Sequence, residues 1–246
     1  MTEEIALFIP CYIDQFYPQV GIATLKLLKK LGCKVHYPMD QTCCGQPMAN
    51  AGRETKAVAS YHHFIDTFKD YNYVVAPSGS CVYHVRKHYD IIRQTKEVTH
   101  LRKNTLDLSE FLIDVLKIQE LKARFPFKVG LHNSCHGLRG LRIGQSSERV
   151  GNDFSKLSQL LGLVKDLQLV PLERYDECCG FGGTFAVTEE AISVQMGQDR
   201  LLDHQRNGVE VITAGDMSCL MHLEGIAKRQ KNPVRVMHLA EILNHE

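Results

Sequence analysis

The chain has 246 residues, a length that suits two domains of about 120 residues each better than one. Its hydrophobic content of 44% and charged content of 23% are ordinary for a globular protein and exclude a disordered or fibrous chain. The formal net charge of +1, with Lys and Arg scattered along the sequence, gives no electrostatic basis for binding nucleic acid.

The amino-terminal sequence and the cysteine content bear on the cellular compartment. No basic residue precedes the first apolar run at residues 5–10, and this run is too short for a signal peptide. No stretch approaches the roughly 18 apolar residues of a membrane helix, so we expect a cytoplasmic protein with no integral membrane segment. Because the cytoplasm keeps thiols reduced, nine cysteines predict metal binding rather than disulfide pairing.

The first half of the chain alternates predicted strands and helices. Short runs rich in β-branched and aromatic residues predict buried strands at residues 5–10, 33–37 and 73–77. Amphipathic patterns predict helices at residues 20–31 and 55–68. A third helix is expected to begin at Ser80, which would serve as its N-cap.

The second half repeats this order. Matching strands are predicted at residues 127–132, 167–172 and 209–214, and matching helices at residues 153–161, 189–204 and 218–229. Alternating strands and helices imply right-handed crossovers and a mainly parallel sheet. We therefore expect an α/β fold of two similar lobes, each a mainly parallel sheet flanked by helices, related by a pseudo-twofold axis. The hydrophilic stretch at residues 93–104 and the turn at Phe125-Pro126 bracket the boundary, which predicts domains at residues 1–122 and 123–246.

Three cysteine-containing elements occur in the same order in both halves: a single Cys, a Cys-Cys-Gly and a Ser-Cys-x-x-His. In the first half they are Cys11, Cys43-Cys44-Gly45 and Ser80-Cys81-Val82-Tyr83-His84. In the second half they are Cys135, Cys178-Cys179-Gly180 and Ser218-Cys219-Leu220-Met221-His222. Two such triples in one order indicate a duplicated motif. Cys33 has no counterpart in the second half, and we expect it to be a core residue.

Four thiols in each half, from three separated segments, predict a site for a soft metal. They match the ligand number of a tetrahedral zinc ion or a four-iron cluster. Adjacent cysteines point apart, so they suit a multi-iron cluster, in which each sulfur reaches a different iron, better than a single ion. The single cysteines follow predicted strands, and loops meet at the carboxyl ends of parallel strands. We therefore expect each set to converge at one edge of its lobe.

The double pattern resembles the CCG, or cysteine-rich, domain of heterodisulfide reductase B subunits, glycolate oxidase iron–sulfur subunits and the lactate utilization protein A family. The resemblance extends over essentially the whole chain. It implies a cytoplasmic iron–sulfur electron-transfer subunit of an L-lactate oxidation system, working beside other subunits of a complex that converts L-lactate to pyruvate. It also implies one or two clusters of 4Fe-4S type. The implied ligands of one cluster are Cys11, Cys43, Cys44 and Cys81, and those of the other are Cys135, Cys178, Cys179 and Cys219.

One feature sets this chain apart from the family pattern. The CCG pattern usually ends Cys-x-x-Cys, whereas both copies here end Cys-x-x-His. His84 and His222 are therefore candidates for an additional ligand or for ordinary helix residues. Between the two copies, the longer first gap of the second, from Cys135 to Cys178, suggests that the two sites are not equivalent. His132 and His136 flank Cys135 and are candidates for orienting it.

Other functions remain open from the sequence alone. A zinc protein with structural or scaffolding thiolate sites is one alternative, and zinc is also a substitute metal for an iron site. A thiol–disulfide subunit analogous to heterodisulfide reductase is another. The sequence shows no flavin site and no base for abstracting a proton from a hydroxy acid, so whether the chain is itself an enzyme stays open and no catalytic residue is assigned.

Overall fold

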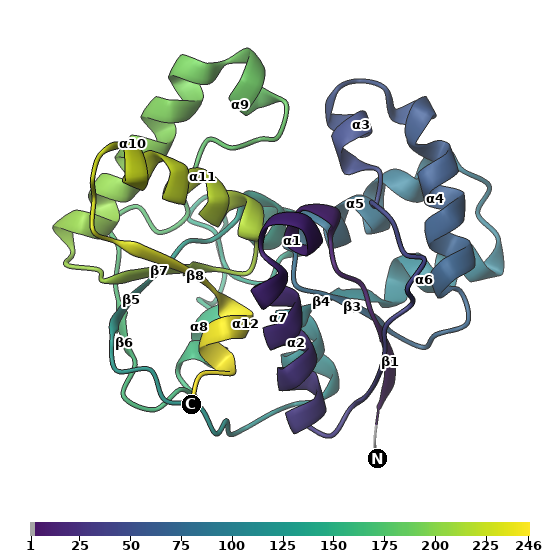
Figure 1. Cartoon of the computed structure of the whole chain (residues 1–246), viewed down its shortest axis with the longest axis horizontal. Helices are drawn as coiled ribbons and strands as arrows, with labels where there is room; N and C mark the ends of the chain where they lie inside the picture. The colour runs from purple at the N-terminus through teal and green to yellow at the C-terminus, as the bar shows by residue number, and fades with distance from the viewer. Residues whose placement is uncertain (1–2) are drawn as a thin grey trace.

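The computed structural model describes residues 3–246, so Met1 and Thr2 of the amino-terminal segment discussed above lie outside the described part. Two four-stranded parallel sheets form the framework, in the orders β2-β1-β3-β4 and β6-β5-β7-β8 (Figure 1). The first sheet consists of β1 (Glu4–Leu7), β2 (Lys34–His36), β3 (Val74–Ala76) and β4 (Thr105–Asp107). The second consists of β5 (Lys128–Leu131), β6 (Gln168–Val170), β7 (Val211–Ala214) and β8 (Arg235–His238). The same topology occurs twice, which confirms the predicted α/β fold of two similar lobes.

Helices flank both sheets. Those of the first lobe are α1 (Cys11–Phe16), α2 (Pro18–Lys30), α3 (Gln46–Asn50), α4 (Glu54–Phe68), α5 (Gly79–His88), α6 (Lys96–Asn104) and α7 (Leu108–Glu110). Those of the second lobe are α8 (Lys156–Leu161), α9 (Phe185–Thr188), α10 (Glu190–Arg206), α11 (Met217–Arg229) and α12 (Leu239–Leu243). A 3₁₀ turn covers Tyr89–Ile91, and π-helical segments cover Phe111–Val115 and His136–Leu141.

The burial of the strands explains their sequences. The inner strands β3 and β7 are buried along their whole length, because helices cover both faces of each sheet. The outer strands β2 and β6 are partly exposed and contain polar residues.

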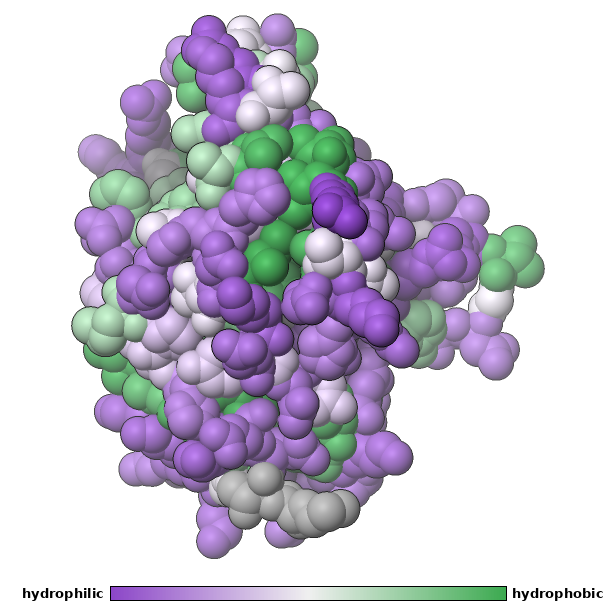
Figure 2. Space-filling view, turned by 90° about the vertical axis from the view of Figure 1, so that its right-hand side faces the viewer, coloured by the Kyte–Doolittle hydropathy of each residue, from purple (hydrophilic) through white to green (hydrophobic). Residues whose placement is uncertain are grey.

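No helix among residues 3–246 combines the length and the apolar character that crossing a membrane requires. Figure 2 shows that hydrophilic residues cover most of the face on the side of α4 and α6, around one hydrophobic strip.

The predicted strands and helices are all present, with ends shifted by a few residues, but three details differ. The N-cap of α5 is Ser78 rather than Ser80: the Ser78 side chain accepts a hydrogen bond from the Cys81 amide. Ser80 is already inside the helix, and its hydroxyl donates to Asp216 instead. The hydrophilic stretch at residues 93–104 contains α6, a helix of the first lobe. The fourth strands, β4 and β8, were not predicted.

Equivalent elements of the two lobes meet at their junction. Helix α12 packs against α2 of the first lobe, and α7 packs against α8 of the second (Figure 1). Between them, Ser78 and Asp216, the N-caps of α5 and α11, form an antiparallel bridge. One hydrophobic core runs continuously through both lobes. These reciprocal contacts are those of a pseudo-twofold arrangement.

Asp216 is the polar centre of this junction. Its carboxylate is almost fully buried and accepts five hydrogen bonds, from the Tyr12 hydroxyl, the amide and hydroxyl of Ser80, and the amide and hydroxyl of Ser218. The donors come from three helices, α1, α5 and α11. The first turns of two helices also carry positive partial charge that favours a carboxylate. Asp216 therefore ties together the helices that follow β1, β3 and β7.

Replacing Asp216 with Ala should lower the free energy of unfolding by about 3 kcal/mol, because several buried donors lose their acceptor. Asp216→Asn, which keeps one acceptor oxygen, should lose less. Anaerobic urea unfolding would measure both, with Asp70→Ala, an exposed position after α4, as the control. An Asp216→Ala protein as stable as the control would contradict this assignment.

Asp107 is a second buried carboxylate and caps α7. Its Oδ1 accepts hydrogen bonds from the amide and hydroxyl of Ser109, while the side chain of Glu110 accepts one from the Asp107 amide. Burial is the main reason that the pKa of Asp107 rises to about 7. The folded protein therefore holds a proton at Asp107 at a pH where the unfolded chain releases it.

Stability should consequently fall, through Asp107, as the pH rises from about 4 to about 7. The carboxyl is neutral in both states below this window, and its full cost is present above it. Asp107→Asn keeps the cap without the charge, so its advantage over the wild type should grow across the window, by on the order of 3 kcal/mol. Urea unfolding of both proteins at pH 5 and pH 8 would measure it. A stability difference that is the same at both pH values would refute the shift.

Candidate metal centres

The topology brings each predicted set of cysteines to the carboxyl edge of its sheet. Cys11 is the first residue of α1, which follows β1, and Cys81 lies in the first turn of α5, which follows β3. Cys43 and Cys44 lie in the loop between β2 and α3. Loops of a parallel sheet converge at this edge, so three distant segments supply neighbouring thiols.

The first set forms a chain of hydrogen-bonded thiols that runs Cys11, Cys43, Cys44, Cys81. Hydrogen bonds from Cys11 and Cys44, with a smaller contribution from the Gly45 amide, lower the pKa of Cys43 to about 3. The Gly45 nitrogen lies 3.4 Å from Cys43 Sγ. The pKa values of Cys11 and Cys44 are raised, mainly because their protons are shared with Cys43. Hydrogen bonds therefore link the four thiols pairwise, in one series.

The second set has the same arrangement, in the order Cys135, Cys178, Cys179, Cys219. Here the Gly180 nitrogen lies 3.4 Å from Cys178 Sγ. Hydrogen bonds from Cys135 and then Cys179 lower the pKa of Cys178 to about 2. Cys179 and Cys219 are buried, whereas Cys135 and Cys178 are partly exposed.

Cys33 stands apart from both sets. It is buried in the hydrophobic core beside β2, and burial raises the pKa of its thiol to about 11. The structure therefore brings the eight motif cysteines together in two groups of four and leaves Cys33 in the core. Four thiols from three segments fit the donor set of a tetrahedral ion or of a four-iron cluster.

The glycine after each Cys-Cys pair has a backbone that other residues rarely adopt. Gly45 has φ +89° and Gly180 has φ +87°. A Cβ at Gly45 would lie 2.6 Å from the Tyr61 ring, and one at Gly180 would lie 2.6 Å from the backbone oxygen of Ser193. Glycine therefore lets the cysteine loop turn and rest directly on α4 or α10.

Gly180→Ala should displace the Cys178-Cys179 loop, because a Cβ has no room against the backbone of α10. We expect a loss of about 2 kcal/mol in unfolding free energy and less metal bound at the second set. Metal analysis and urea unfolding would measure the two effects. Gly225→Ala is a matched control, since nothing lies within 4 Å of its Cβ position in α11. Equal behaviour of the two variants would contradict the role of Gly180.

The two histidines that end the motifs have different surroundings. His222 lies 3.2 Å, through Nε2, from the backbone oxygen of Ser193 in α10. His84 is buried, packs its ring against Tyr61 and stacks on His88 at 4.8 Å between centroids. Burial and the neighbouring His88 lower the pKa of His84 to about 3, which keeps it neutral. Its Nε2 has no hydrogen-bond partner among the described residues.

A third histidine lies closer to the thiols. One ring nitrogen of His132, Cys179 Sγ and Cys219 Sγ all lie within 4.8 Å of one another, and all three residues are buried. Burial, and then the charge of Arg200, lower the pKa of His132 to about 3. His136, on the other side of Cys135, faces the Tyr83 ring at 5.2 Å between centroids.

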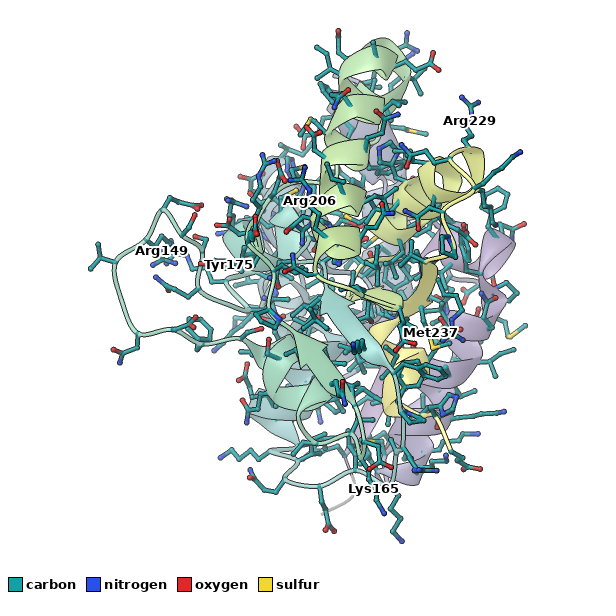
Figure 3. All side chains as sticks on the ribbon, turned by 90° about the vertical axis from the view of Figure 1, so that its left-hand side faces the viewer. Arg149, Lys165, Tyr175, Arg206, Arg229 and Met237 are labelled. Carbon is teal, nitrogen blue, oxygen red and sulfur yellow. The ribbon has the colours of Figure 1, made fainter. Side chains whose placement is uncertain are left out.

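Sequence reasoning missed Arg200, which is fully buried in α10 and donates from Nε to Nδ1 of His132 at 3.3 Å. Its Nη1 donates to Asp203 at 2.7 Å and to the backbone oxygen of Arg174 at 2.6 Å. Figure 3 shows α10 rising beside the second sheet, with Arg206 toward its lower end. The available signal was the helical spacing of Gly197, Arg200 and His204, which places a cation on the apolar face of the predicted helix.

Two lobes with one convergent set of four thiols each define a duplicated cysteine-rich protein. The family model described as a cysteine-rich domain, CCG, matches residues 5–86 and 129–224, one match in each lobe. Lactate utilization protein A of an Exiguobacterium species is 41% identical, over 98% of this chain and 96% of the relative. Lactate utilization protein A of Halalkalibacterium halodurans is 40% identical, over 99% and 97%. The chain therefore belongs to the lactate utilization protein A family of cysteine-rich domain proteins.

Likeness to solved structures is much weaker. Glutamate racemase RacE1 of Bacillus anthracis matches 99% of this chain and 79% of its own, with a TM-score of 0.37 and 12% sequence identity. These values are too low to carry an argument about function.

Proposed function

We propose that the protein is an iron–sulfur electron-transfer subunit of a cytoplasmic system that oxidises L-lactate to pyruvate. The observation that carries the proposal is the convergence of two equivalent groups of four thiols. The name of its relatives, lactate utilization protein A, supports the substrate. We further propose that residues 1–122 and 123–246 are the two cysteine-rich units, each holding one cluster of 4Fe-4S type.

The donor sets favour iron–sulfur clusters over zinc. Structural zinc sites are typically built from Cys-x₂₋₄-Cys pairs, whose spacing lets two sulfurs grip one ion. No such pair occurs in this sequence, and each set contains directly adjacent cysteines instead. Adjacent side chains point apart, which suits a cofactor with several metal atoms. The alternative is a structural or scaffolding protein that binds zinc. Metal analysis would distinguish it from an iron–sulfur protein.

An acidic thiol and a neighbouring backbone amide would help to hold the cofactor in each set. Cys43 and Cys178 carry the most acidic thiols, so they are the first to be thiolates. The Gly45 amide donates a hydrogen bond to the sulfur of Cys43, and the Gly180 amide donates one to the sulfur of Cys178. Donors of this kind tune the reduction potential of a cluster. A bound cluster would supply one-electron transfer at each site.

Cysteine exposure supports electron exchange with partner subunits. Cys11 is exposed and Cys135 is partly exposed, whereas Cys44, Cys81, Cys179 and Cys219 are buried. Each centre would thus have one edge close to the surface. Oxidation of lactate to pyruvate releases two electrons and two protons, so a subunit that carries single electrons needs a partner that takes the hydride or the electron pair from the substrate.

The ligand assignment predicts a contrast between two classes of cysteine. Cys43→Ser and Cys178→Ser should each remove about one cluster of iron and sulfide from protein prepared without oxygen, because each thiol lies at the centre of its set. Cys33→Ser should leave iron unchanged, since Cys33 lies in the core. Iron, sulfide and zinc analysis with an electronic spectrum would measure this.

Three outcomes would count against the proposal. Wild-type protein that holds zinc without iron and sulfide would identify a zinc protein. Equal iron loss from Cys33→Ser would refute the ligand sets. Turnover of a disulfide by the cluster-loaded protein, without electron exchange with a lactate-oxidising partner, would favour a thiol–disulfide subunit.

A further inference from the structure

His132 presents a buried polar atom to the second set of thiols. It is the first residue after β5 and is fully buried. Its ring lies within 4.8 Å of Cys179 Sγ and Cys219 Sγ. Nδ1 is engaged by Arg200, and Nε2 is buried without a hydrogen-bond partner among residues 3–246. Nε2 is therefore the ring nitrogen that has no partner in the described part of the chain.

Arg200 decides what His132 can do there. A guanidinium has N–H donors and no acceptor, so its 3.3 Å contact requires a lone pair on Nδ1. The proton of the neutral imidazole is then on Nε2, which makes Nε2 a donor toward sulfur. A metal bond from Nε2 would need the opposite tautomer, with an Nδ1 proton facing the guanidinium. Asp203 and the Arg174 carbonyl hold Arg200 in place, so the arrangement selects donation over ligation.

The equivalent position of the first lobe carries no such donor, because it is occupied by Phe8. Phe8 is the first residue after β1, and its amide donates to Val75 on β3 at 2.9 Å. The His132 amide makes the equivalent bond to Thr213 on β7 at 2.7 Å. The Phe8 ring packs against Phe64 of α4, whereas the His132 ring meets Arg200 of α10. The same place in the fold is thus an aromatic core in one lobe and a polar network in the other.

We propose that His132 is a hydrogen-bond donor to the sulfurs of the second metal centre and not one of its ligands, and that it raises the reduction potential of that centre above that of the first. The inference rests on the proposed iron–sulfur function. A donor to sulfur stabilises the added negative charge when one electron enters, so the donated hydrogen bond favours the reduced state. Electrons entering at the first lobe would therefore pass to the second.

The test compares His132→Phe, which installs the first-lobe residue, with the wild type, both prepared without oxygen. Iron and sulfide should stay at wild-type levels, because no ligand is lost. In a potentiometric titration, the higher of the two reduction potentials should move down toward the lower one. His132→Gln can place an amide N–H near the same point, so it should restore part of the difference.

A matched control and a direct measurement separate donation from ligation and from general packing. His204→Phe replaces a second fully buried histidine, which belongs to α10, lies against Gly130 and is outside the group formed with the two sulfurs, so it should change the potentials much less than His132→Phe does. Electron–nuclear double resonance on the reduced protein with ¹⁵N-labelled histidine should show only weak nitrogen coupling in the second centre.

The iron content and the reduction potentials of His132→Phe decide between the possible roles of His132. Loss of about one cluster of iron in His132→Phe, or strong coupling typical of metal-bound imidazole, would show that His132 is a ligand and overturn the inference. Unchanged potentials in His132→Phe with full iron content would also overturn it while leaving the iron–sulfur function intact. Wild-type protein without iron and sulfide would overturn the proposed function itself.

Discussion

The structure depends on one buried carboxylate at the junction of the two lobes. Asp216 accepts hydrogen bonds from residues on α1, α5 and α11, and two of these helices carry Cys81 and Cys219 in their first turns. A buried charge without a cation is stable only when donors surround it. The position of Asp216 therefore fixes the helix starts relative to one another, and with them the inner cysteines of both thiol sets.

Duplication supplied the framework, and divergence distinguished the two halves. Strand order, cysteine order and the left-handed glycine after each Cys-Cys pair are the same in both lobes. The surroundings of the thiols are different: aromatic rings back the first set, around Phe8 and Phe64, while His132 and Arg200 back the second. Identical thiol sets in unlike surroundings would give the metals they bind different electronic properties.

Much of the fold could be predicted because its information is local. Apolar runs predicted the inner strands, and the rule that loops converge at the carboxyl ends of parallel strands predicted the meeting of the thiols. Strand β4 escaped prediction because it has three residues, two of them polar, Thr105 and Asp107. Arg200 escaped because its role appears only when α10 packs beside β5. Side-chain roles that depend on tertiary partners leave little trace in a linear pattern.

The packing of α12 against α2 across the junction has a consequence for folding during synthesis. Helix α2 of the first lobe is covered by α12 of the second lobe, and Lys30 at the end of α2 pairs with Glu246 at 2.6 Å. On the ribosome, the first lobe can form its sheet and gather its thiols long before α12 emerges. One side of α2 then stays uncovered until α12 has been synthesised. Covering of α2, and with it closure of the core between the lobes, therefore depends on the second lobe supplying α12.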